Sequence, residues 1–362
     1  LLYHEKPADA LRWLEEGLES ARTLKDDDVD ISVAAFLVDI GWAHMRLGEL
    51  DAALDALESG LEGLPAEPST IRGDALSSLT GVYIYRGDVQ SALEYGKEAL
   101  NNARSIPDLW QEQIALSNLA IAHHRALDWR GAVDSLLDAV VLAEQIGDKR
   151  VLAGQAVNLG NTYMNLGEGD AAARQLTRGI DLARESHLVE YELLALQSLA
   201  ELMIRTGDLA GATARLLEMP ALLEIIDSVD NEIKVQRAWA EVKLANGEVD
   251  GALTHAEAAI RAADERNLHG PAAIVRRVMG EILLAEGQPE RARAILSTSF
   301  EVLQPGYLHE ATRSQFHLGR AKVALGEEAE GIDLIMQAQA TFEQLGAGFD
   351  LAEVEQYLHL RR

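Results

Sequence analysis

One pattern recurs along this chain about every 40 residues, and it constrains the fold more than any other feature of the sequence. In each copy a turn residue, usually Gly, is followed five positions later by Ala or, once, by Gly. A fixed period of this length is typical of solenoid proteins, in which supersecondary units stack on one another. The turn residues lie at steps of 39 or 40 residues, at Gly48, Gly87, Leu127, Gly167, Gly207, Gly247, Gly287 and Gly326.

Each unit carries the signals of two helices joined by a short turn. After the first turn, Leu54, Leu57 and Leu61 follow the spacing of one apolar helix face. No segment shows the alternation of an exposed strand, so the sequence predicts an all-α fold. Seven residues before each turn residue stands a small side chain, which lets a second helix approach closely. These positions are Gly41, Thr80, Ala120, Gly160, Ala200, Ala240, Gly280 and Gly319.

The repeat resembles a known family. The segment AVNLGNTYMNLGEGDAAARQLTRGIDLA looks like a tetratricopeptide repeat (TPR), whose signature positions are matched by Leu159, Gly160, Tyr163, Ala172 and Leu176. The unit of about 40 residues is similar to the long form of the repeat in kinesin light chain, in G-protein-signalling-modulator adaptors and in bacterial multidomain regulators. The resemblance implies a right-handed superhelical α-solenoid whose first helices line a concave, partner-binding groove.

The predicted organisation is a tandem array with two partial ends. Residues 1–26 are expected to form a partial repeat with one helix of the second type, and 27–346 to form eight TPR-like repeats. Residues 347–362 are expected to form a helix that either caps the array or leads to another domain. Because the chain begins at Leu1 and enters helical sequence directly, we interpret it as a piece of a longer polypeptide.

The charge balance excludes several kinds of partner. The chain has 32 Lys and Arg against 59 Asp and Glu, a formal charge of −27, which repels nucleic acid phosphates. It has no Cys, so disulfides, thiolate catalysis and Cys-ligated metals are excluded. No run of 18 residues is free of charge, which disfavours a membrane span. We therefore expect a cytoplasmic protein that binds neither nucleic acid nor membrane.

Enzyme signatures are missing from the sequence. It contains no GxxxxGK[ST], GxGxxG, GxSxG or HExxH motif. The only adjacent histidines, His123 and His124, point about 100° apart on a helix, which is poor for binding one metal ion. The sequence therefore predicts a protein that is not an enzyme and that has no cofactor and no metal site.

Candidate groove residues in the first half of the chain are aromatic or carry amides. Asn can donate to and accept from a peptide backbone without reading its sequence, and Asn158 and Asn161 match positions that bind peptide backbone in long-repeat relatives. The alternative is that these amides only bond to the helix of the adjacent repeat. The predicted groove residues here are Trp42, Tyr85, Asn118, His124, Asn158 and Asn161.

In the second half the same face gathers basic residues. Basic side chains on one face of an acidic protein predict a partner with an acidic segment or a C-terminal carboxylate. The alternative is pairing within one helix, for which Arg237–Glu241 and Arg277–Glu281 have the right spacing. Two of the arginines lack such a neighbour and are the stronger candidates, Arg313 and Arg320; the full predicted set is Lys234, Arg237, Arg277, Arg313 and Arg320.

The functional prediction is a non-catalytic scaffold that binds a protein or peptide segment in its groove. It is expected to be the sensory or interaction region of a larger regulator, bacterial by its resemblance. The alternative is a self-assembly module that stacks through its terminal helices, with an enzymatic or DNA-binding output in flanking domains.

Overall fold

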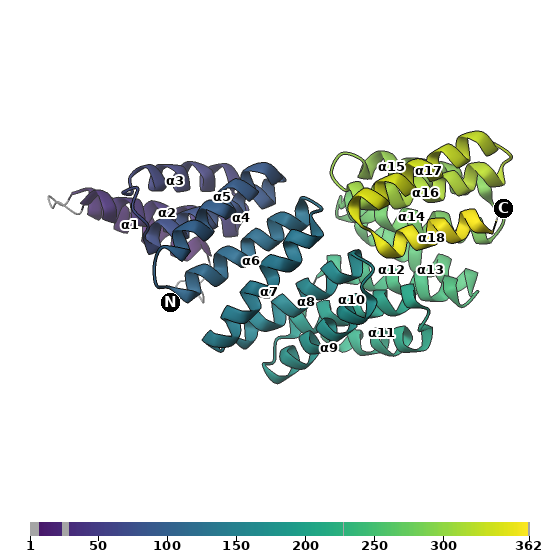
Figure 1. Ribbon diagram of the computed structural model, residues 1–362, viewed down its shortest axis with the longest axis horizontal. Helices are drawn as coiled ribbons and strands as arrows, with labels where there is room; N and C mark the ends of the chain where they lie inside the picture. The colour runs from purple at the N-terminus through teal and green to yellow at the C-terminus, as the bar shows by residue number, and fades with distance from the viewer. Residues whose placement is uncertain (1–6, 24–28, 227, 361–362) are drawn as a thin grey trace. The chain divides into compact units, whose positions relative to one another are not determined.

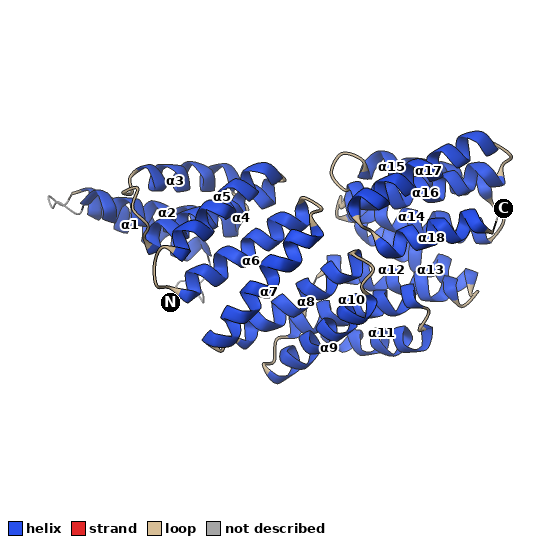
Figure 2. Cartoon of the chain, viewed as in Figure 1, coloured by secondary structure: helices blue, strands red, loops and turns tan. Residues whose placement is uncertain are grey.

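The computed structural model describes residues 7–23, 29–226 and 228–360 (Figure 1). Throughout this part of the chain the only regular secondary structure is helix, as Figure 2 shows. The prediction of an all-α fold of helical repeats is confirmed. The predicted terminal segments extend beyond the described residues at 1–6, 24–26 and 361–362.

The helices divide between two compact units, residues 1–148 and 149–362. Unit 1 contains α1 (Pro7–Arg22), α2 (Val29–Leu47), α3 (Leu50–Glu62), α4 (Thr70–Arg86), α5 (Val89–Arg104), α6 (Leu109–Arg125) and α7 (Trp129–Ile146). Unit 2 contains α8 (Lys149–Asn165), α9 (Gly169–Glu185), α10 (Val189–Thr206), α11 (Leu209–Leu223), α12 (Val229–Ala245), α13 (Val249–Glu265), α14 (His269–Ala285), α15 (Pro289–Leu303), α16 (Leu308–Ala324), α17 (Glu328–Leu345) and α18 (Gly348–His359).

The turn residue of each repeat adopts the left-handed backbone conformation that ends a helix. Gly87, for example, has φ 76°, and the Asp88 side chain then accepts a hydrogen bond from the backbone N–H of Ser91 at 3.1 Å, which caps the next helix. Leu127 takes the same conformation with φ 60°, which a residue with a Cβ rarely adopts. The turn geometry is therefore a property of the repeat, and Gly is the residue that fits it without strain.

The small positions are places where two helices nearly touch. A Cβ on Gly160 would lie 2.5 Å from Leu176 Cγ, and one on Gly319 would lie 2.7 Å from the carbonyl oxygen of Gly331. Both distances are too short for a methyl group. The close approach of the two helices in each repeat explains why the sequence keeps this position small.

First helices of successive repeats pack side by side within each unit. In unit 1, α4 packs against both α2 and α6. In unit 2, α8, α10, α12, α14 and α16 form a second continuous row, and α18 returns from α17 to contact α8 (yellow in Figure 1). Apolar side chains such as Leu79 in unit 1 and Leu196 in unit 2 are fully buried between the helices.

No helix in the described part of the chain is both long enough and apolar enough to cross a membrane. The first helices of the repeats carry side chains that reach the surface, and the candidate sites lie on these helices.

Candidate functional site

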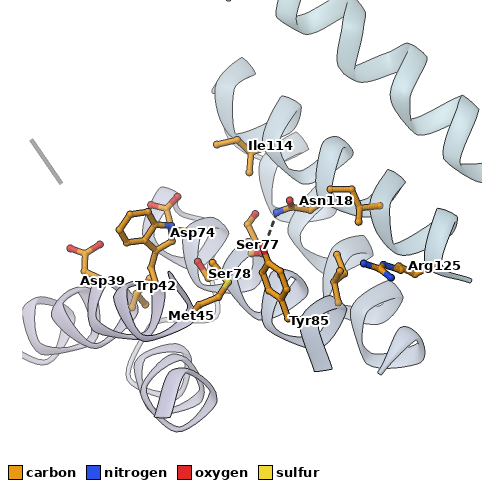
Figure 3. A pocket seen from close by; sticks show the side chains of 14 residues that line it. Asp39, Trp42, Met45, Asp74, Ser77, Ser78, Tyr85, Ile114, Asn118 and Arg125 are labelled. Atoms are coloured by element: carbon orange, nitrogen blue, oxygen red, sulfur yellow. Dashed lines mark hydrogen bonds between the residues drawn. The ribbon is translucent and has the colours of Figure 1, made fainter. Parts of the chain in front are cut away.

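The α2, α4 and α6 helices of unit 1 enclose an open pocket of about 610 Å³, shown in Figure 3. These three are first helices of consecutive repeats, so the pocket lies where the resemblance predicted a groove. It contains three of the predicted groove residues, Trp42, Tyr85 and Asn118. The lining residues are Val38, Asp39, Trp42, Met45, Asp74, Ser77, Ser78, Gly81, Ile84, Tyr85, Ile114, Asn118, Ile121 and Arg125.

Large apolar groups are left open to solvent in this pocket. The Tyr85 side chain is 70% exposed, and Ile121 is exposed as well. Trp42 and Met45 lie on α2 and face the same space (Figure 3). A cluster of exposed large side chains in a concavity is typical of a surface that a partner covers.

Asn118 makes a structural bond. Its side-chain Nδ2 donates to the backbone carbonyl of Ser77 at 3.2 Å, which links α6 to α4 across one repeat. This is the packing role that the sequence left open as the alternative for its Asn residues. The amide still lines the pocket, so its position also allows contact with a bound segment.

Two carboxylates, Asp39 and Asp74, lie at the end of the pocket where Trp42 lies, and Arg125 lies at the opposite end (Figure 3). Gln111 Nε2 donates to Asp74 Oδ1 at 2.6 Å. Both carboxylates remain exposed to solvent in part. Partial burial, and then repulsion from Asp74, raise the pKa of Asp39. Partial burial also raises the pKa of Asp74, against the lowering effect of the Gln111 hydrogen bond and with a further increase from Asp108. The pocket is therefore acidic at one end and basic at the other.

Sequence reasoning selected neither carboxylate, nor Ser77, nor Arg125. Spacing from the small position Thr80 does place Asp74, six residues before it, and Ser77, three before it, on the groove face of α4, but neither was chosen as a site residue. His124, in contrast, is half-buried on α6 and does not line the pocket.

The other two predicted amides lie in unit 2. Asn158 is exposed and Asn161 is half-buried, and both lie on α8. Thr162 Oγ1 donates to the backbone carbonyl of Asn158 at 2.7 Å. This hydrogen bond does not involve the Asn158 side chain.

The basic residues predicted for the second groove all lie in unit 2, but each of them is paired with a carboxylate. Lys234 pairs with Asp230 at 2.5 Å. Arg237 pairs with Glu201 of the preceding repeat at 2.9 Å, and not with Glu241 as its spacing suggested. Pairing across repeats wins because α10 and α12 lie side by side, which brings residues 36 apart into contact.

Arg277 is the most buried of these cations, with a side chain only 1% exposed. It pairs with Glu281, as its i,i+4 spacing suggested, and also with Glu241 and Glu310, each at 3.4 Å. Three carboxylates within unit 2 therefore neutralise this one guanidinium.

Arg313 and Arg320, chosen because no acidic residue lies four positions away on the same helix, both have acidic partners in the structure. Arg313 pairs with Glu310 and with Asp350, each at 3.1 Å. Arg320 lies 3.7 Å from Glu353. Two of these three carboxylates belong to α18, far from i±4 spacing, so a search along one helix could not find them.

The α18 helix lies against the first helices of unit 2. Asp350, 3% exposed, also pairs with Arg205 of α10 at 2.9 Å and with His309 of α16 at 2.9 Å. Tyr357 packs edge-on against Phe316 of α16, with ring centroids 5.9 Å apart. The helix therefore joins α10 to α16, and it supplies acidic partners to Arg313 and Arg320, two of the cations that the sequence assigned to a partner.

Glycines allow α18 to begin close to the turn between α8 and α9. A Cβ on Gly167 would lie 2.7 Å from the Cα of Gly348, and a Cβ on Gly348 would lie 2.7 Å from the carbonyl oxygen of Leu166. Any larger residue at Gly348 would push the helix away from the turn.

The charges of this network are fixed by their neighbours. Arg205 and Arg313 hold the pKa of Asp350 well below its usual value, although burial opposes them. Arg313 and Arg277 likewise lower the pKa of Glu310 against the effect of burial. Burial, and then Arg320, hold the pKa of His317 well below its usual value, so this imidazole is neutral near pH 7.

Comparisons with known proteins agree with this architecture. A family model described as the MalT-like TPR region matches residues 73–354. Human SH3 domain and tetratricopeptide repeat-containing protein 2 is 24% identical over 180 residues, 49% of this chain. The match spans only 13% of that human protein.

Two solved structures share the fold. The Rap conjugation gene regulator of plasmid pLS20, in complex with the Phr* peptide, has a TM-score of 0.64 at 13% identity, over 94% of each chain. NprR in complex with its cognate peptide NprX has a TM-score of 0.55 at 15% identity, over 96% of this chain and 84% of that one. At these identities the likeness concerns the fold.

Proposed function

The chain belongs to the MalT-like TPR family, and from this premise we propose that it is a non-catalytic scaffold that binds a peptide or an extended protein segment in the unit 1 pocket. The observation that carries the proposal is the open pocket across α2, α4 and α6. It leaves Tyr85 and Ile121 exposed, and it presents polar groups at both ends. A concave surface with an apolar middle and a few polar groups is what peptide recognition requires.

The fold likeness supports a peptide as the partner. The pLS20 regulator and NprR, which share this fold, were both solved with a peptide bound. We propose that this chain also serves a regulatory protein, in the cytoplasm of a bacterium, by reporting the presence of its partner. Support for the regulatory and bacterial setting comes from the pLS20 regulator and from the resemblance of the repeat.

An acidic segment remains our proposal for a second partner site, on Lys234, Arg237, Arg277, Arg313 and Arg320 in unit 2. The ion pairs above mean that such a segment has to displace α18, because Asp350 and Glu353 already face Arg313 and Arg320. Asn158 and Asn161 would contribute backbone contacts to the same bound segment. A chain that ends at residue 346 would free Arg313 and Arg320 from Asp350 and Glu353, and we expect it to bind an acidic peptide that the full chain does not bind.

Self-assembly is the second candidate function. It would use α1 and α18 as stacking surfaces, and α18 would then have to leave unit 2, where Val354 is fully buried. Sedimentation velocity over a hundred-fold range of concentration separates the two functions, since a groove binder stays monomeric and an assembly module does not.

The test of the main proposal is a selection of random heptapeptides on the immobilised full chain, followed by affinity measurements on each winner. The variant pair Tyr85→Ala and Ile121→Ala removes exposed apolar groups from the pocket and should weaken binding at least tenfold. The matched control is Leu217→Ala, which removes an equally exposed apolar group from α11 in unit 2. Winners that bind the pocket variant and the wild type equally would overturn the proposal.

A further inference from the structure

The unit 1 pocket has a chemical preference that its charges define. Resting on the proposed function, we infer that the pocket selects a peptide with a positively charged nitrogen, which it holds between Asp39 and Asp74 beside the indole of Trp42. The nitrogen belongs to a Lys or Arg side chain or to the N-terminal ammonium of the peptide. An apolar neighbour in the same peptide then covers Tyr85 and Ile121.

The two carboxylates have no cation of their own. Within residues 7–23, 29–226 and 228–360, neither Asp39 nor Asp74 forms an ion pair with a basic side chain. They repel each other, and this repulsion is part of what raises the pKa of Asp39. A cation between them would replace repulsion with attraction on both sides. In unit 2, by contrast, Glu201 on a first helix is paired with Arg237.

A buried hydroxyl points to the same site independently of the charges. Ser77 lies between the two ends of the pocket in Figure 3, is only 8% exposed, and has a side-chain oxygen with no hydrogen-bond partner among the described residues. A buried polar atom without a partner destabilises the fold, because it has lost its hydrogen bonds to water. Such an atom in the wall of a pocket is satisfied when a ligand group bonds to it. The hydroxyl can accept from an ammonium or donate to a peptide carbonyl.

The remaining walls suit a peptide that carries such a charge. Trp42 adds a flat apolar wall beside the carboxylates, and the guanidinium carbon of Arg46 already lies 5.6 Å from its ring centroid. Arg125 lies at the far end of the pocket, so a peptide that places its cation beside Asp39 directs carbonyl or carboxylate oxygens toward this guanidinium. The pocket therefore also favours one direction of the bound peptide.

The experiment repeats the heptapeptide selection on two proteins, the full chain and its Asp39→Asn/Asp74→Asn variant. We expect winners on the wild type to be at least threefold richer in Lys, Arg or a required free N-terminus than the input, and this enrichment to vanish on the variant. Each wild-type winner should bind the variant at least tenfold more weakly. The variant should fold at least as stably as the wild type, because it removes a repulsion, so weaker binding cannot be attributed to unfolding.

Two further arms complete the test. The matched control is Asp55→Asn/Asp134→Asn, which makes the same charge change on α3 and α7 at exposed residues outside the pocket and should leave every affinity unchanged. Acetylating the N-terminus of a winner, and separately replacing its Lys or Arg by Gln, identifies which nitrogen is bound.

The outcomes separate the inference from the function on which it rests. Winners that bind through Tyr85 but carry no positive charge, or that ignore the Asp39→Asn/Asp74→Asn change, would overturn the inference and leave the proposed function standing. A selection that yields no pocket-dependent peptide at all would overturn both.

Discussion

Asp350→Asn should detach α18 from the first helices of unit 2, whereas Glu353→Gln on the same helix should not. Both changes remove one negative charge and keep the side-chain shape. The carboxylate of Asp350 faces Arg205, Arg313 and His309 at distances of 2.9 to 3.1 Å, and these groups lower its pKa well below the usual value. Burial and repulsion from Glu281 instead raise the pKa of Glu353. The folded chain therefore favours the charge at the first position and disfavours it at the second.

The expected magnitude follows from the burial of Asp350. Removing one partner of a buried ion pair costs about 3–5 kcal/mol. Asn keeps the volume and can still accept a hydrogen bond, so we expect the lower end of the range, about 3 kcal/mol. That cost corresponds to a roughly hundredfold faster exchange of the α18 amide hydrogens, at about 1.4 kcal/mol for each factor of ten. If unit 2 unfolds as one body, the same cost lowers its Tm by about 6–12 °C.

Hydrogen–deuterium exchange on the full chain is the assay, read separately on α18 and on α13, which serves as the reference helix. Asp350→Asn should speed exchange in α18 and in the facing turns of α10 and α16, and Glu353→Gln should leave α18 as protected as in the wild type, or more so. Equal effects of the two variants would refute the reasoning, because burial alone and not the arginine network would then hold the helix.

Three other predictions follow from local contacts. Gly319→Ala should lower the free energy of unfolding by about 1–3 kcal/mol, because the added Cβ would clash with the carbonyl oxygen of Gly331. A Cβ at Gly306 meets open space, so Gly306→Ala should change this free energy by less than about 0.5 kcal/mol. Urea titration measures both changes. The free energy of unfolding should fall as the pH drops below about 6.5, because His317 binds a proton in the unfolded chain but stays neutral in the folded one, where it is buried. His317→Gln should therefore reduce this pH dependence. Urea titrations between pH 5 and 8 measure it. Asp39→Asn/Asp74→Asn should raise the Tm at pH 7, and this gain in Tm should shrink as the pH falls toward 4. The reason is that the wild-type carboxyls have raised pKa values, so they take up protons in the folded state before they do so in the unfolded state. Scanning calorimetry at both pH values measures the sign of the change.

The helices and turns could be predicted because their causes are local. The left-handed turn at Gly87, its Asp88 cap and the close approach at Gly160 each depend on a few neighbouring residues, and the repeat displays each one several times. One repeat without Gly, at Leu127, would have been missed alone and was recovered by the period of the others.

The ion pairs of unit 2 could not be predicted from spacing along one helix. Arg237 and Glu201 are 36 residues apart, one repeat less a helical turn, and Arg277 and Glu241 have the same separation. Pairs with this separation can be predicted once it is known that the first helices stack side by side. The pairing of Arg205 with Asp350 cannot be predicted in this way, since it spans 145 residues and depends on where α18 docks.

The unit 1 pocket is the proposed binding site for a peptide. Hydrogen–deuterium exchange of the full chain with and without a saturating selected heptapeptide tests it most directly. Slower exchange is predicted in α2, α4 and α6, near Trp42, Ser77 and Ile121, with no change in α11 and α13 of unit 2. Protection confined to unit 2, or bound peptide with no protection in these three helices, would contradict the account.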